Sequence, residues 1–302
     1  MNIALSGITK KFGSTLALDD VSLDFRGRVN LVLGTNGSGK STLLNVISGV
    51  TYPQEGSLTL GAEELRSSDK RRWRKGIEGA RTKMGFVLDK PGYPSYLDGA
   101  ELLDWASSRR DPEWTEQVTQ RLEMAPFVHR AIGGYSSGMT QKIGLGTSMV
   151  SKPELILWDE PTANLDAPTR RSVSSLIEEL AEKGTMFIIA SHTPEDFEGV
   201  ADWMCVMRLG RVLMSGLIKD LSSGSVRLVI KSDKSSLLAA DVLRTGLADK
   251  AEVRDGELEL ETRGVADVEA VKKMAGSTHA EVGSVEVKPK SVSELYAEAI
   301  AP

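Results

Sequence analysis

One nine-residue stretch, GTNGSGKST at positions 34–42, constrains the fold of this chain more than any other segment. The apolar run before it, Val29 to Leu33, predicts a strand, and the run after it, Leu43 to Val50, predicts a helix. The stretch is therefore a glycine-rich loop that enters a helix. Such a loop favours an α/β fold, because the helix N-terminus and the exposed backbone N–H groups together form an anion site.

The loop satisfies the pattern G-x-x-x-x-G-K-[ST] at every required position. Its glycines let backbone N–H groups curve around phosphate oxygens without Cβ clashes. Lys40 is predicted to neutralise the β and γ phosphates, and the Ser41 hydroxyl to bind Mg²⁺. The ligand is then a nucleoside triphosphate. The loop residues predicted to bind it are Gly34, Asn36, Gly37, Ser38, Gly39, Lys40, Ser41 and Thr42.

A loop of this kind does not separate kinases, GTPases and motor ATPases, but two later segments narrow the choice. LILWDE, residues 155–160, predicts an apolar strand that ends in two carboxylates. Asp159 is placed to hold Mg²⁺, and Glu160 to polarise the attacking water. His192 follows the apolar run MFIIA and a serine, at a strand end where ligands gather in such sheets. Taken singly, these are an acidic strand exit and a packed or solvent-facing histidine.

Short apolar runs alternate with helical patterns, which predicts a largely parallel sheet flanked by helices. Residues 96–150 break this alternation with helical patterns alone, so they predict a helical subdomain at about 95–150. The predicted strands are Val29 to Leu33, Met84 to Leu88, Leu155 to Trp158, Met186 to Ala190 and Trp203 to Met207.

The segment SSGS, residues 222–225, predicts a linker, and a different pattern begins after it. The order strand, helix, two strands, helix, strand, helix resembles a small ferredoxin-like α+β module. The expected domains are an α/β P-loop NTPase over residues 1–222 and a small α+β domain over residues 226–302. Its strands are predicted at 226–231, 251–253, 257–261 and 280–287, and its helices at 236–245, 265–275 and 292–300.

The composition excludes several other classes of protein. The net charge of −5 over 302 residues argues against a polyanion as main partner, so no nucleic acid is expected. The single cysteine, Cys205, cannot form an intrachain disulfide, which fits a reducing cytoplasm. No apolar run approaches the roughly 18 residues needed to cross a bilayer, and the N-terminus has no signal-peptide pattern.

At this point residues 1–222 resemble the ATP-binding cassette (ABC) family. GTNGSGKST resembles its Walker A motif, LILWDEP its Walker B motif with catalytic Glu160, and His192 its switch histidine. ANLD, residues 163–166, resembles the D-loop. YSSGM, residues 135–139, stands where the LSGGQ signature belongs, and Phe12 matches the aromatic residue that stacks on adenine.

The resemblance implies a fold, a mechanism and partners. Two cassettes, identical or related, dimerise head to tail, so that the P-loop of one and the signature of the other bind each ATP. Ser136 and Gly138 are then expected to contact the γ-phosphate across the interface, and Asp166 to belong to the nucleotide site. Glu160, His192 and Lys40 are the expected catalytic residues. ATP closes the dimer, and hydrolysis lets it open.

Two departures from the family pattern stand out. The family's glutamine after the strand at 84–88 is replaced by Asp89, which could reach Mg²⁺ through water but adds negative charge beside the phosphates. The signature has Ser137 and Met139 for the usual glycine and glutamine. Met139 followed by Gln141 and Lys142 resembles the cassettes of bacterial multidrug and antibiotic exporters.

Two surface segments have alternative interpretations. KRRWRK, residues 70–75, predicts a solvated charged edge, with a nucleic-acid or lipid-headgroup patch as the alternative and anionic lipid contact as the functional one beneath a bilayer. The apolar stripe between Tyr93 and Trp105 predicts a helix core. In the family this region forms a groove for a short helix of the membrane subunit, which singles out Tyr93, Tyr96 and Leu97.

The first hypothesis is therefore the ATPase subunit of an exporter, peripheral on the cytoplasmic face of the cell membrane and paired with separate integral membrane subunits. A second hypothesis is a soluble cassette ATPase that acts on nucleic acid or ribosomes. A third is a degenerate cassette that binds ATP, hydrolyses it slowly and works beside a more active partner, which Asp89 keeps open.

Overall fold

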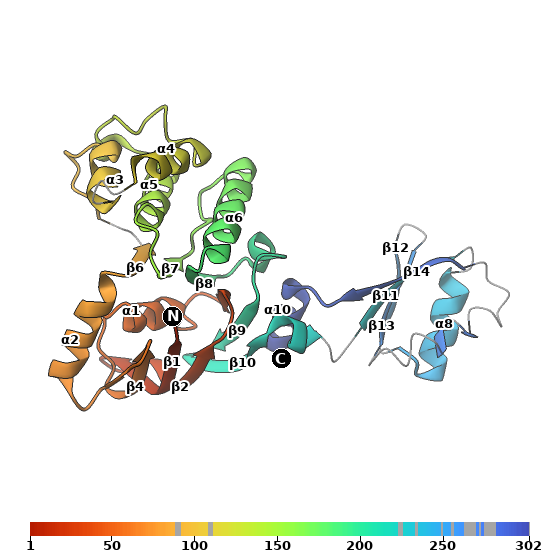
Figure 1. Ribbon diagram of the computed structural model, residues 1–302. Coiled ribbons are helices and arrows are strands. Elements are labelled where there is room, and N and C mark those ends of the chain that lie inside the picture. The colour runs from red at the N-terminus through yellow and green to blue at the C-terminus, as the bar shows by residue number, and fades with distance from the viewer. Residues whose placement is uncertain are drawn as a thin grey trace. The chain divides into compact units, whose positions relative to one another are not determined.

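The computed structural model describes residues 1–87, 92–107, 111–222, 226–232, 235–248, 250–254, 257–262, 270–271, 273–274 and 282–301. The chain divides into two compact units, Met1–Leu217 with 299–302, and Ile218–Glu298 (Figure 1). The first unit ends shortly before the predicted linker at 222–225, of which residues 223–225 lie outside the described residues.

A six-stranded sheet with the order β10-β9-β3-β8-β7-β6 forms the centre of the first unit. Every pair from β9 to β6 is parallel, and β10 pairs antiparallel with β9. All residues of β3, β7 and β8 are buried, as expected for strands covered on both faces. The five predicted strands are confirmed. The strands are β3 (Val29–Leu33), β6 (Met84–Val87), β7 (Leu155–Asp159), β8 (Met186–Ser191), β9 (Trp203–Arg208) and β10 (Arg211–Leu217).

A second, antiparallel sheet with the order β2-β1-β4-β5 was not predicted. Its strands are half-buried and alternate between core and solvent, so they lack the continuous apolar runs that reveal the central sheet. Side chains of both sheets and of helix α1 (Lys40–Ile47) pack into one hydrophobic core. The strands are β1 (Ile3–Phe12), β2 (Thr15–Phe25), β4 (Glu55–Leu60) and β5 (Glu63–Arg66).

Two helices differ from the sequence predictions. Helix α1 begins at Lys40 rather than Leu43, because the phosphate-binding pattern itself supplies the first helical turn. The segment KRRWRK opens helix α2 (Lys70–Arg81), whose N-cap Asp69 accepts a hydrogen bond from the Arg72 N–H at 2.9 Å. Trp73 is buried in this helix, so the segment is only partly the solvated edge that was predicted.

Residues 96–150, which were predicted to be helical, contain helices that follow β6. They are α3 (Gly99–Ser107), α4 (Pro112–Arg121) and α5 (Ser137–Met149), with a short 3₁₀ turn at Ile132–Gly134 before α5. Within α3, Leu102 and Leu103 are buried, as predicted. Tyr96 and Trp105 of the same apolar stripe are 81% and 79% exposed, so the helix-core interpretation is wrong for these two rings.

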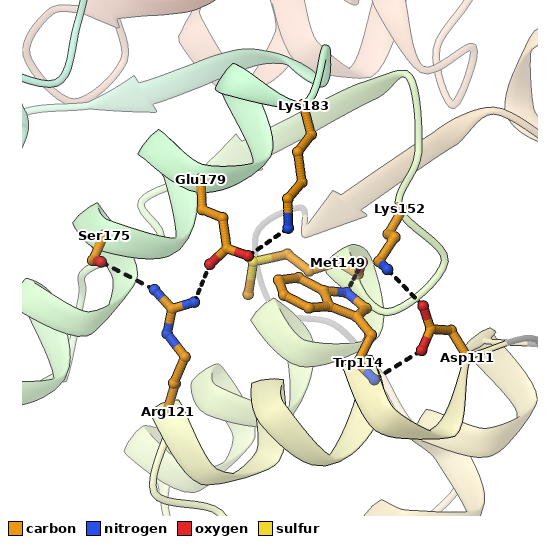
Figure 2. A network of polar contacts seen from close by, with 8 residues as sticks. All are labelled: Asp111, Trp114, Arg121, Met149, Lys152, Ser175, Glu179 and Lys183. Atoms are coloured by element: carbon orange, nitrogen blue, oxygen red, sulfur yellow. Dashed lines mark hydrogen bonds and ion pairs between the residues drawn. The ribbon is translucent and has the colours of Figure 1, made fainter.

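A polar network joins α4 to helix α6 (Ala167–Glu182), as Figure 2 shows. Two ammonium groups lie near the Trp114 ring, with Lys152 at 5.1 Å and Lys183 at 5.3 Å from its centroid. Its indole N–H donates to the Met149 carbonyl at 3.1 Å. The network therefore ties α4 to the end of α5 and to α6. Its ion pairs are Asp111 with Lys152 at 2.5 Å, Glu179 with Lys183 at 2.6 Å, and Glu179 with Arg121.

The second unit contains a four-stranded antiparallel sheet with the order β12-β13-β11-β14. This order places β13 between β11 and β12, the split arrangement expected of a ferredoxin-like module. The predicted helix at 265–275 lies largely outside the described residues. The elements are α7 (Ile218–Leu221), β11 (Val226–Ser232), α8 (Ser235–Thr245), β12 (Lys250–Arg254), β13 (Glu257–Thr262), β14 (Val282–Pro289) and α10 (Val292–Ile300).

Candidate functional site

The central sheet brings three strand ends to one edge. In the parallel register Leu33 of β3 lies opposite Ser191 of β8, and Ala190 of β8 lies opposite Asp159 of β7. Residues that directly follow these strands must therefore meet at the carboxyl edge of the sheet, where ligands bind in open α/β folds. The P-loop, Glu160 and His192 each follow one of these strands.

The P-loop has the backbone geometry of an anion site. Gly37 and Gly39 have left-handed φ angles of 79° and 106°, and a Cβ at Gly39 would lie 2.6 Å from the Ala17 carbonyl oxygen. Such alternating backbone conformations turn successive N–H groups inward. The Ser38 hydroxyl is buried and has no hydrogen-bond partner within the described part of the chain. The loop therefore fits a ligand that brings oxygen acceptors, and Asn36 is exposed at its tip.

Lys40 is buried within this loop at 5% exposure. Its ammonium donates to the Gly34 carbonyl at 2.8 Å and lies 3.4 Å from the Thr35 carbonyl oxygen. The Nζ atom also lies 3.7 Å from Oε1 of Glu160. A buried ammonium needs partners of this kind, since its charge is costly to remove from water. The lysine is thus held at the centre of the loop that is predicted to receive phosphates.

Glu160 connects the loop to the histidine. Its Oε2 lies 2.8 Å from His192 Nδ1, and its backbone N–H donates to the Ala190 carbonyl at 2.9 Å. The φ angle of Glu160 is 50°, a left-handed value that is uncommon for residues other than glycine. The structure therefore brings together Lys40, Glu160 and His192, the three residues predicted to be catalytic.

Two of the three residues predicted to hold Mg²⁺, Asp159 and Ser41, lie in the described part of the chain. Asp159 is buried at 5% exposure as the last residue of β7, and Ser41 is exposed on the first turn of α1, beside half-buried Thr42. Asp89 lies outside the described residues. Within the described ranges no cluster of three or more acidic, histidine or cysteine side chains could hold a metal alone. In phosphate sites Mg²⁺ takes one or two protein ligands beside phosphate oxygens and water.

Phe12, predicted to stack on adenine, ends strand β1 and is 51% exposed. The Lys10 ammonium lies 4.8 Å from the centroid of its ring. An aromatic ring of this exposure can present a face to a base, and stacking is tolerant of base identity.

The signature and D-loop residues begin two helices. Ser136 is the N-cap of α5, and its Oγ accepts from the Met139 N–H at 3.3 Å. Asp166 is the N-cap of α6, and Oδ1 accepts from the Thr169 N–H at 2.9 Å. Hydrogen bonds from Thr169 lower the pKa of Asp166 below its ordinary value. Asp166 thus has a structural role as a cap, and its nucleotide contact stays a prediction.

The sequence did not predict that Gln141 contacts Glu160. The Gln141 side-chain amide donates to the carbonyls of Glu160 at 3.2 Å and Pro161 at 3.0 Å. No local pattern predicts this contact, because Gln141 lies on α5 and the two carbonyls follow β7.

A strand, a glycine-rich loop with a buried lysine, and a second strand that ends in two carboxylates define the P-loop NTPase class. Comparisons with known proteins narrow this class. The family model "ABC transporter" matches residues 18–163. The chain is 30% identical to the daunorubicin resistance ATP-binding protein DrrA3 of Streptomyces coeruleorubidus, over 73% of this chain and 70% of that protein. The chain belongs to the ABC transporter family, as one of its ATP-binding cassettes.

Other matches agree with this family. The chain is 31% identical to the molybdenum import ATP-binding protein ModC of Vibrio cholerae, over 81% of this chain, and spans 66% of the length of that protein. A solved structure titled as the dimeric structure of MJ0796, a bacterial ABC transporter cassette, has a TM-score of 0.63 at 23% identity. That match covers 71% of this chain and 98% of the other, and it shows the same fold.

Proposed function

We propose that this chain is the ATP-binding and ATP-hydrolysing subunit of an ABC exporter, peripheral on the cytoplasmic face of the membrane, which acts through head-to-tail dimerisation. The observation that carries the proposal is that the Glu160 carboxylate contacts both Lys40, at 3.7 Å, and His192, at 2.8 Å. These contacts support the proposal because hydrolysis of a γ-phosphate uses a cation, a carboxylate base and a further polar group beside the P-loop.

Each residue has a role in this proposal. On nucleotide binding, Lys40 exchanges its bond to the Gly34 carbonyl for the β and γ phosphates. Glu160 accepts the proton of the attacking water at a carboxylate oxygen, and His192 orients that carboxylate through Nδ1. The Ser41 hydroxyl and Asp159 would hold Mg²⁺, with Asp89 reaching it through water. Bound Mg²⁺ neutralises charge on the β and γ oxygens.

A single chain would supply half of each of two sites. Ser136 and Gly138 begin α5, so the N-terminus of this helix is available to the γ-phosphate of ATP held by a second cassette. A solved structure of the MJ0796 cassette is dimeric, which supports the pairing of two cassettes. The second cassette is a copy of this chain or a related chain.

The test uses the full chain with the substitution Glu160→Gln, which keeps side-chain size but removes the base. With saturating Mg-ATP this variant should associate into a stable dimer and show no turnover, while Mg-ADP leaves it monomeric. Light scattering coupled to size-exclusion chromatography measures the association. A variant that stays monomeric in Mg-ATP, alone and with related cassettes from the same cell, would contradict the proposal.

The proposal also states the direction of transport, which is out of the cell. It rests on the signature variant, with Met139, Gln141 and Lys142, and on the similarity to a daunorubicin resistance protein. The similarity to a molybdenum import protein favours the opposite direction. Co-purification from membranes, with identification of the integral subunit that accompanies the chain, distinguishes the two. Recovery of a substrate-binding protein with the complex would overturn the export assignment.

The proposed membrane partner has a candidate surface on the helical subdomain. A groove beside α3 is lined by Leu97, Glu101 and Trp105, and Tyr96 is exposed nearby. Tyr93 is half-buried instead, and burial raises the pKa of its hydroxyl. We therefore assign the contact with the membrane subunit to Tyr96, Leu97 and Trp105. Within the described ranges, no helix has the length and apolar character that a bilayer crossing requires.

The alternative role of residues 70–75, contact with anionic lipid, concerns helix α2. Trp73 and Ile77 turn its apolar side into the core, so Arg71 and Lys75 are left on an exposed face. Two other cations of this helix are paired, Arg72 with Glu63 at 3.8 Å and Arg74 with Glu78 at 3.1 Å. Anionic lipid contact through Arg71 and Lys75 should appear as binding to vesicles with anionic lipid that is lost in moderate salt.

A further inference from the structure

Gln141, on the second turn of α5, contacts the backbone of the residue that is proposed as the catalytic base. Its amide nitrogen is 3.2 Å from the Glu160 carbonyl oxygen and 3.0 Å from the Pro161 carbonyl oxygen. A side-chain amide has two N–H donors, and here one group reaches two successive carbonyls. The half-buried position of Gln141 makes these bonds stronger than bonds in open solvent.

Gln141 lies on the same side of α5 as other residues that make close contacts. Gly138, Gln141 and Lys142 are spaced i, i+3 and i+4, so they lie on one side of the helix. A Cβ at Gly138 would lie 2.9 Å from the Asn164 carbonyl oxygen, so only glycine allows the helix to approach the loop this closely. Lys142 pairs with Glu123 at 3.1 Å. The helix that begins at Ser136 therefore packs against the loop that begins at Glu160.

Glu160 depends on such contacts for its conformation. Its left-handed φ of 50° is sparsely populated by non-glycine residues and persists only where surrounding groups hold it. The Glu160 N–H donates to the Ala190 carbonyl, and the Glu160 carbonyl accepts from the Gln141 amide at 3.2 Å and from the Ala163 N–H at 3.2 Å. This backbone conformation directs the Glu160 carboxylate between Lys40 and His192.

We propose that Gln141 is a positioning residue that holds the Glu160 backbone in its left-handed conformation and so sets the carboxylate for attack on ATP. The inference rests on the proposed ATPase function. Because Gln141 lies on the helix whose N-terminus would engage the second ATP, it also links occupancy of that site to the carboxylate that serves the first.

The test replaces the amide by a side chain of similar length without donors, Gln141→Met, in the full chain. The matched control is Gln117→Met on α4, where the glutamine is exposed. Loss of the two bonds lets the carboxylate shift, and a misplacement of this kind lowers kcat by about tenfold or more. The Kd for ATP, measured by titration calorimetry, should stay within about twofold of the wild-type value, because the P-loop contacts do not involve Gln141.

Two further variants separate positioning from support of the fold. Gln141→Lys retains N–H donors with enough reach for both carbonyls, and it should recover most of the wild-type kcat. Gln141→Glu, which offers only acceptors to two carbonyls, should not recover it. A purely structural role would instead lower the thermal unfolding midpoint and weaken ATP binding in all three variants.

The outcomes distinguish this inference from the proposed function. If the wild-type chain, with its membrane partners, turns over ATP no faster than Glu160→Gln, the proposed function fails. If the wild type is active and Gln141→Met has the kcat of Gln117→Met, the positioning role of Gln141 is overturned while the ATPase assignment stands.

Discussion

The Nζ atom of Lys40 and the Oε1 atom of Glu160 lie 3.7 Å apart. Lys40 follows strand β3 and Glu160 follows strand β7, with β8 between these strands in the sheet. Because all three strands are parallel, their carboxyl ends share one edge, and side chains from distant parts of the chain meet there. A γ-phosphate bound by Lys40 would therefore lie within reach of the Glu160 carboxylate.

Substitution of the buried lysine should weaken nucleotide binding. Lys40→Met removes a charge-assisted contact to phosphate of about 1.5–3 kcal/mol, which weakens the Kd for Mg-ATP by about 10- to 100-fold. Titration calorimetry measures the change. The apo variant should unfold at a temperature close to that of the wild type, since Met fills the same space, and an unchanged Kd would contradict the assignment.

His192 should affect turnover more than binding. His192→Ala removes the partner of the Glu160 carboxylate at 2.8 Å. Loss of such support for a proton acceptor is expected to lower kcat by about 100-fold, with little change in the Kd for ATP. Steady-state ATPase assays measure the effect. His129→Ala, an exposed histidine of the helical subdomain, is the control, and equal kcat in the two variants would remove His192 from the mechanism.

Asp89 stands where the family has a glutamine, and the sequence predicts that exchanging it for glutamine changes turnover. Asp89→Gln removes one negative charge from the neighbourhood of the phosphates and restores the amide that the family uses. Removal of this repulsive charge should raise kcat by about threefold or more. Identical ATPase kinetics in the two forms would show that Asp89 does not act at the site.

The network in Figure 2 should make stability depend on pH in a specific direction. Hydrogen bonds from Lys183 and then Arg121 lower the pKa of Glu179. A carboxyl group with a lowered folded-state pKa stabilises the protein above its unfolded pKa, near 4.5, and loses this effect as the pH falls through the folded pKa.

Glu179→Gln should therefore lower the free energy of unfolding by about 0.5–1 kcal/mol at pH 7 and by less below about pH 4. Urea titrations at several pH values measure this dependence. The control is Glu178→Gln, an exposed neighbour on the same helix, which should have little effect at any pH. A loss of equal size at pH 7 and at acidic pH would contradict the ion-pair explanation.

The exposed rings of Tyr96 and Trp105 should affect assembly with the membrane subunit but not ATP binding. Tyr96→Ala with Trp105→Ala removes apolar surface that is 81% and 79% exposed in this chain. Folding and the Kd for ATP should be unchanged, whereas the fraction of chain recovered with the membrane subunit should fall at least about tenfold, as for other aromatic anchors. Leu213→Ala on β10, also exposed, is the control. Normal recovery of the double variant would exclude this surface.

The central sheet could be predicted because its strands are continuous apolar runs and its motifs are local. The antiparallel sheet could not, since its strands alternate between core and solvent and give a weaker signal. Helix α2 was not predicted from the sequence for a related reason. Its many cations suggest a solvated edge, and only the packing of Trp73 into the core shows that the segment is an ordered helix.

The candidate site divides in the same way. The P-loop, the paired carboxylates and His192 follow from the residues themselves, because the spacing within a strand, loop and helix depends on local backbone geometry. The left-handed conformation of Glu160 and its contact with Gln141 follow from how α5 packs beside β7. Such contacts depend on sheet register and helix packing, which bring together residues whose separation in the sequence carries no information about their distance.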